Sequence, residues 1–81
     1  MKVKNVIKGL LQQYKLEELN IITPERVVFS GNYSQWKETS VDMILYKKAV
    51  ENCEVIDRMI FNNRKAFLFI PELDTYYPPK D

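Results

Sequence analysis

Histidine is absent from the 81 residues, while cysteine occurs once and glycine twice. Histidine is the usual general base near neutral pH and the commonest metal ligand, so its absence excludes histidine-dependent catalysis and histidine metal sites. Carboxylate, lysine or tyrosine groups would have to perform any catalysis, and the sequence contains no evident cluster of them and no cofactor motif. We therefore expect a binding protein rather than an enzyme, with no cofactor and no metal.

The single cysteine, Cys53, has no second cysteine in the chain with which to form a disulfide. No apolar run approaches the length of a signal or membrane segment. Both observations favour a cytoplasmic protein. Cys53 falls on the apolar side of a predicted helix, so we expect it to be a small core residue and not a nucleophile.

Neither sign of charge predominates, because twelve Lys and Arg residues face eleven Asp and Glu residues, which gives a net charge of +1. The whole chain therefore has no strong attraction to nucleic acid or to an anionic membrane. Basic residues are nevertheless concentrated at the N-terminal end, where Lys2, Lys4, Lys8 and Lys15 precede the first acidic residue. This segment is a candidate basic patch, with a solvated helix face as the competing interpretation.

Hydrophobic periodicity predicts two helices. Over residues 2–14, apolar side chains recur at the spacing of one helix face: Val3, Val6, Ile7, Leu10, Leu11 and Tyr14. Over residues 41–52, Ser40 is a suitable N-cap and the apolar residues again form a broad face. Val41 and Ile44 lie instead beside Lys47 on the polar side, so we expect them to contact another element or a partner.

Two β-hairpins are predicted on either side of the second helix. In the first, residues 19–22 and 27–29 are joined by a turn that contains Pro24, which places Ile22 opposite Val27 and Ile21 opposite Val28. In the second, residues 54–61 and 65–70 are joined around residues 62–64, where two asparagines tolerate positive φ.

Alternation along the second hairpin assigns its side chains to two faces. One face is predicted to hold Val55, Asp57, Met59 and Phe61 with Ala66, Leu68 and Ile70. The other is predicted to hold Ile56, Arg58 and Ile60 with Phe67 and Phe69. Both faces are largely apolar, so neither is expected to be plain solvent surface.

The predicted fold is α+β and forms a single domain over residues 1–81. Its element order is αββαββ: an N-terminal amphipathic helix, an antiparallel sheet built from the two hairpins, and one helix between them. Strand order is not determined by these patterns. Residues 71–81 contain three prolines and are expected to form an extended C-terminal tail, in which Tyr76 and Tyr77 contact the domain or remain free.

The leading functional hypothesis is a protein-binding surface centred on Trp36. Trp36 and Tyr33 are predicted to lie in a loop after the second strand, and tryptophan is the side chain best suited to an interface hot spot. Ile44 and Lys47 complete this predicted partner-binding set. In the competing interpretation, Trp36 anchors its loop to the core.

Two alternatives use other residues. In the first, a small nucleic-acid-binding protein stacks bases on Phe67 and Phe69 beside Arg58, with help from the basic helix residues Lys2, Lys4 and Lys8. A helix that covers the same sheet face would remove this possibility. In the second, the two-faced sheet makes the chain a self-assembling structural subunit, for example a homodimer.

Residues 28–36 (VFSGNYSQW), with residues 53–57 (CEVID) and 62–64 (NNR), resemble small uncharacterised α+β proteins carried by phages and mobile elements of Gram-positive bacteria. The shared pattern is an apolar strand, a Phe-x-Gly turn, an aromatic residue shortly after it, a helix, and a hairpin that opens with Glu-Val. The resemblance implies an accessory protein, such as an anti-CRISPR-like inhibitor that occludes a surface of a host or defence protein. It implies no site residues.

Overall fold

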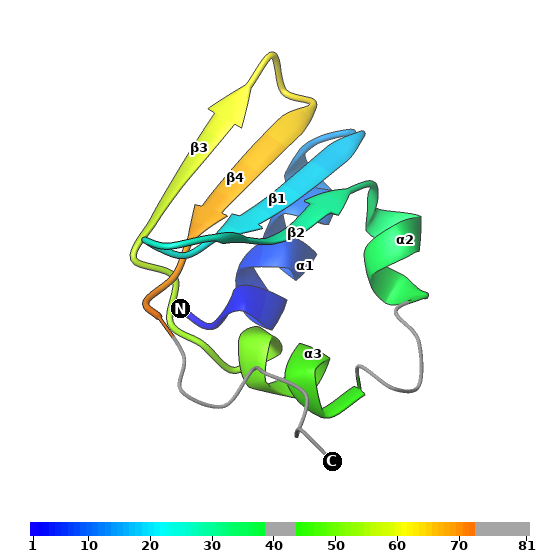
Figure 1. The fold of residues 1–81 in the computed structure, drawn as a ribbon. Coiled ribbons are helices and arrows are strands. Elements are labelled where there is room, and N and C mark those ends of the chain that lie inside the picture. The colour runs from blue at the N-terminus through cyan, green and yellow to red at the C-terminus, as the bar shows by residue number, and fades with distance from the viewer. Residues whose placement is uncertain (39–43, 73–81) are drawn as a thin grey trace.

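A four-stranded sheet with helices on one face forms the fold (Figure 1). The structure is a computed structural model, and it describes residues 1–38 and 44–72. The elements in chain order are α1 (Val3–Gln13), β1 (Glu18–Ile22), β2 (Val27–Gly31), α2 (Tyr33–Lys37), α3 (Ile44–Glu51), β3 (Asp57–Phe61) and β4 (Lys65–Phe69). None of the described helices has the length and apolar content needed to cross a membrane.

The strand order in the sheet is β2-β1-β4-β3. β1 pairs antiparallel with β2, and β3 pairs antiparallel with β4, as two hairpins. The hairpins join side by side through β1 and β4, and these two strands run parallel. The predicted α+β class is confirmed, but the sheet is mixed instead of antiparallel, and two helices instead of one lie between the hairpins.

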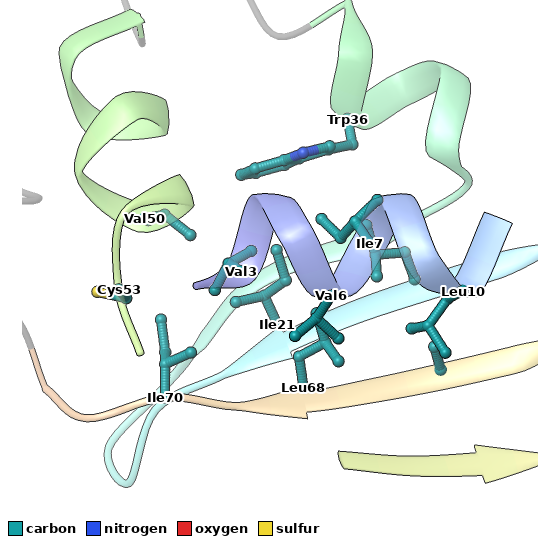
Figure 2. Close-up of a cluster of buried hydrophobic side chains, with 12 residues drawn as sticks. Val3, Val6, Ile7, Leu10, Ile21, Trp36, Val50, Cys53, Leu68 and Ile70 are labelled. Carbon is teal, nitrogen blue, oxygen red and sulfur yellow. The ribbon is translucent and has the colours of Figure 1, made fainter. Parts of the chain in front are cut away.

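The core lies between α1 and the sheet (Figure 2). Val3, Val6, Ile7 and Leu10 are buried on α1, as the periodicity predicts, whereas Leu11 of the same predicted face is 38% exposed. They pack on the side chains that β1 and β4 present to the helices, above all Leu19, Ile21, Ala66 and Leu68. Burying a side chain of Leu or Ile size contributes about 1.5–3 kcal/mol, so this layer is the main source of stability.

Backbone hydrogen bonds attach the start of α1 to the segment after α3. The Val3 N–H donates to the Cys53 carbonyl at 2.9 Å, and the Val55 N–H donates to the Met1 carbonyl at 2.8 Å. Cys53 is 7% exposed and belongs to the core, as predicted. These contacts hold α1 and α3 next to each other on the same side of the sheet (Figure 1).

The first hairpin contains a β-bulge that the sequence pattern does not predict. Ile22 lies opposite Val27 as expected, but the bulge between Ile21 and Ile22 places Ile21 opposite Phe29 and not Val28. The extra residue shifts the register of β2 by one position. As a result, Phe29 rather than Val28 shares the helix-covered face with Ile21.

The second hairpin turns at Asn62 and Asn63, whose φ angles are 53° and 58°. This confirms the predicted turn, but the predicted faces are wrong. The loop spans three residues, 62–64, so Phe61 lies opposite Lys65. The predicted faces put Phe61 on the same side as Ala66, and that arrangement requires an even number of loop residues.

In the observed register, the residues of β3 share a face with different residues of β4 than predicted. Asp57 pairs with Phe69 and Met59 with Phe67, so these side chains share one face with Phe61. Arg58 pairs with Leu68, and Ile60 pairs with Ala66, on the helix-covered face. Alternation along a strand then separates Arg58 from both phenylalanines.

Some predictions concern residues outside the described ranges. The N-cap at Ser40 and the helical start at Val41 lie within residues 39–43. Tyr76 and Tyr77, with most of the predicted tail, lie within residues 73–81.

Replacing Asn63 with alanine should lower the free energy of unfolding by about 1 kcal/mol, because a left-handed φ is unfavourable for a residue with a Cβ and no local hydrogen-bonding side chain. Asn63→Gly should be neutral or stabilising, since glycine reaches positive φ without a steric cost. Urea unfolding monitored by circular dichroism measures both variants. Equal losses for alanine and glycine would contradict the observed turn.

Candidate functional site

Trp36 lies in the short helix α2, which begins at a capping box. The Asn32 side chain accepts a hydrogen bond from the Gln35 N–H, and the Gln35 side chain accepts one from the Asn32 N–H, each at 2.8 Å. This reciprocal arrangement satisfies backbone donors at the helix start. Gly31 leaves the space for it, because a Cβ at residue 31 would meet the Gln35 Oε1 atom.

The Trp36 ring extends from α2 alongside α1 and is 3% exposed (Figure 2). It packs edge-to-face on Phe29 of β2 with ring centroids 5.1 Å apart. Lys47 of α3 places its Nζ atom 5.3 Å from the ring centroid, within the range of a cation–π contact. The same Nζ atom donates to the Lys37 carbonyl at 3.3 Å. Trp36 and Lys47 therefore connect α2 with α3.

A cleft of about 360 Å³ opens between the three helices beside Trp36. Its lining is Lys4, Ile7, Lys8 and Leu11 from α1, Tyr33, Trp36 and Lys37 from α2, and Lys47 and Glu51 from α3. Ile7 and Trp36 are buried and form the floor, whereas Lys4, Lys8 and Lys37 are exposed. We refer to this site as the lysine cleft.

The charges of the lysine cleft are unbalanced, because four ammonium groups face the single carboxylate of Glu51. Within residues 1–38 and 44–72, none of these lysines forms an ion pair with a carboxylate. Lys4 and Lys8 are also one helical turn apart on α1, where like charges destabilise a helix by about 0.2–0.5 kcal/mol. An anionic group in the cleft would reduce this repulsion.

The cleft unites residues that the sequence assigns to two different hypotheses. Tyr33, Trp36 and Lys47 belong to the predicted partner-binding set, and all three line it. Lys4 and Lys8 belong to the predicted nucleic-acid set and line it too. The backbone of Ile44 lies at the start of α3, and its side chain lies outside the described part of the structure.

The rest of the predicted nucleic-acid set is dispersed. Lys2 forms an isolated β-bridge with Glu54 and does not line the cleft. Arg58 lies on the opposite face of the sheet from Phe67 and Phe69, because of the register described above. The predicted cluster of Arg58 with the two phenylalanines is therefore wrong.

The predicted site sets omit four cleft residues: Ile7, Leu11, Lys37 and Glu51. Leu11 is 38% exposed and lies one turn after Lys8, so a helical projection that includes Lys4 and Lys8 could have suggested a mixed apolar and basic strip. Nothing local indicates that α2 and α3 complete the site. Their contribution depends on how the helices pack, which the sequence pattern does not determine.

Two observations bear on metal binding and on the reactivity of Cys53 in the described part of the chain. Among residues 1–38 and 44–72, no three carboxylate or cysteine side chains gather closely enough to hold a metal ion. Burial raises the pKa of the Cys53 thiol, which favours the neutral form and disfavours nucleophilic attack. Asp57, which the sequence places between apolar residues on one predicted face, is exposed on the edge strand β3.

Comparison of the chain with known protein families, with curated proteins and with solved structures finds no significant match. The function of the lysine cleft is therefore inferred from its own geometry and charge. The resemblance to proteins of phages and mobile elements stays a prediction.

Replacing Trp36 with alanine should lower the free energy of unfolding by about 3–5 kcal/mol, because it removes a buried ring from the core. Trp36→Phe should cost less, since a smaller ring still contacts Phe29. Leu11→Ala, which truncates a more exposed apolar residue on the same cleft, serves as the control. Urea unfolding followed by circular dichroism gives the three values, and wild-type stability in Trp36→Ala would contradict a core position.

Proposed function

We propose that the protein is a non-enzymatic binding module and that the lysine cleft takes an acidic segment of a partner protein. The observation that supports this proposal is the excess of four lysines over one glutamate around an apolar and aromatic floor. A carboxylate of the partner pairs with one or more ammonium groups, and a neighbouring apolar side chain contacts Leu11 and Tyr33. Electrostatic attraction of this kind accelerates association and selects acidic partners.

The dimensions of the cleft suit a short segment of a protein chain. Pockets of about 300–1,000 Å³ take drug-sized ligands, so a cleft near the lower limit holds a few side chains and not a folded domain. The main contribution of Trp36 is structural, because its ring is almost entirely buried. Lys8, Lys37 and Leu11 are the more accessible contacts.

A nucleic-acid partner is disfavoured by the distribution of aromatic side chains. Base stacking requires an exposed aromatic face, and the Trp36 ring in the cleft is 3% exposed. Phe67 and Phe69 lie on the other face of the sheet, where the charged residues of the strands are Glu18, Asp57 and Lys65. The basic residues of the cleft and these phenylalanines thus serve different surfaces.

The proposed mechanism is occlusion. A partner whose acidic segment enters the cleft has that segment covered by α1, α2 and α3, and loses access to it for other interactions. This is the mode of action expected of an anti-CRISPR-like inhibitor or of another inhibitor of a host or defence protein, and we extend the proposal to such a role. The required property of the target is an exposed acidic and apolar segment.

A labelled peptide that repeats Asp-Glu-Leu should bind the protein, and a matched peptide that repeats Asn-Gln-Leu should not. Reversing two cleft charges with Lys8→Glu and Lys37→Glu should weaken binding by about tenfold or more, because each removes an attraction and adds a repulsion. The control is Lys15→Glu with Lys48→Glu, which changes the net charge equally at exposed residues outside the cleft. Fluorescence anisotropy measures the affinities.

Two results would contradict the proposal. Equal weakening by the cleft variant and the control would show that the peptide responds only to net charge. Binding of a single-stranded oligonucleotide without binding of the acidic peptide would favour the nucleic-acid alternative. Amide NMR spectra recorded during the titration locate the contact, which should perturb Lys8, Leu11 and Lys37.

A further inference from the structure

The face of the sheet opposite the helices carries an aromatic patch. Figure 1 shows α1, α2 and α3 on one side of the sheet, and no described helix on the other. On this open face, Met59 and Phe61 of β3 are 45% and 44% exposed. They lie beside Phe67 and Phe69 of β4, which are half-buried. We call these four side chains the open-face patch.

The patch is ordered by contacts within the sheet. Met59 lies directly opposite Phe67, and the Phe61 and Phe67 rings meet edge-to-face with centroids 5.4 Å apart. On the β1 side the surface becomes polar, because the Ser30 hydroxyl donates to Asn20 Oδ1 at 2.7 Å and Asn20 Nδ2 donates to Glu18 Oε2 at 3.0 Å. The middle of β1 is therefore polar on this face, while at the Phe69 end the apolar surface continues through Ile22 to Val27, which is 60% exposed.

Two opposite charges lie at the two ends of the patch. Asp57 is beside Phe69 at one end, and Lys65 is beside Phe61 at the other. Along β3, the distance from Asp57 to Phe61 is four residue steps, or about 13 Å at 3.3 Å per residue. Neither Asp57 nor Lys65 forms an ion pair with another residue of the described ranges. Glu18 is adjacent to Lys65 in the register, but its carboxylate is engaged by Asn20.

We propose that a second copy of this chain covers the open-face patch in a two-fold symmetric, face-to-face dimer. In such a dimer, a residue that contacts another across the interface is contacted by it in return. The two-fold axis runs parallel to the sheet face and at right angles to the line from Asp57 to Lys65. It places each lysine over the partner's Asp57, while the aromatic patches pack on each other. The strands of the two sheets then cross at a moderate angle, as in aligned sheet packing at about 30°.

Pairing through the exposed edge of β3 is less favourable than pairing through the face. Arg58 points toward the helix-covered side of this edge strand and remains exposed. A charge directed inward on an edge strand opposes the addition of another strand, since continuing the sheet would bury it. The edge is therefore protected, and the open face is not. The lysine cleft lies on the other side of the sheet, so the dimer does not depend on the proposed function.

Sedimentation velocity over a range of protein concentrations tests the dimer. The wild-type chain should form a dimer at micromolar concentration, and Phe61→Ser should weaken dimerisation by about tenfold or more because it removes an exposed aromatic contact of the patch. Ile56→Ser is the matched control: Ile56 is 67% exposed but lies before β3 and outside the patch. Circular dichroism verifies that both variants fold.

Exchange of the two charges tests the proposed geometry. Asp57→Lys alone and Lys65→Asp alone should each weaken the dimer, because each places like charges opposite each other. The double variant should recover most of the wild-type affinity. A monomer at all concentrations, an equal effect of Phe61→Ser and Ile56→Ser, or a double variant weaker than either single variant would overturn the proposal.

Discussion

The parallel pairing of β1 with β4 is the constraint on which the rest of the fold depends. Each hairpin is local, but the sheet exists only because Leu19 lies beside Ala66 and Ile21 beside Leu68. Parallel strands require a connection that crosses from one end of the sheet to the other. The chain between β2 and β3 makes this connection, and it brings α2 and α3 to the face that α1 already covers. The lysine cleft results from this crossing.

The side chain of Asn20 reinforces the same junction. It is 5% exposed, donates to the Ala66 carbonyl at 3.3 Å, and accepts from the Ser30 hydroxyl. It thereby links β1 to both neighbouring strands. A buried amide is tolerated when its hydrogen bonds are made within the protein, and a shift of register would break them. Asn20 therefore favours one alignment of the two hairpins.

Local patterns predicted the parts of the fold that local interactions determine. The periodicity of Val3, Val6 and Leu10 identified α1, and two adjacent asparagines identified the turn before β4. Strand order was out of reach, since it depends on contacts between hairpins far apart in the sequence. The faces of β3 were predicted wrongly because a single residue in the loop length exchanges them. Helix α2 was missed because its start depends on the side chains of Asn32 and Gln35, within a segment that looks like a loop.

The candidate site was predictable only in its components. The basic character of the N-terminal helix and the proximity of Tyr33 to Trp36 are visible in the sequence. Their convergence with Lys37 and Lys47 depends on helix packing, and so does the burial of Trp36. The two faces of the sheet consequently have different chemistry: a positive cleft among the helices on one side, and methionine and phenylalanine side chains on the other.

The order of β1 and β4 in the chain also has a kinetic consequence. The hairpin of β3 and β4 closes a three-residue loop, and hairpins form within about 1–10 μs. Pairing of β1 with β4 must close a much longer loop before it gains any contacts, so it is expected to be the slow step. During synthesis, β1 has no parallel neighbour until β4 has left the ribosome. The apolar surface of α1 then lacks half of the sheet that later covers it, and the nascent chain is most prone to aggregation in this interval.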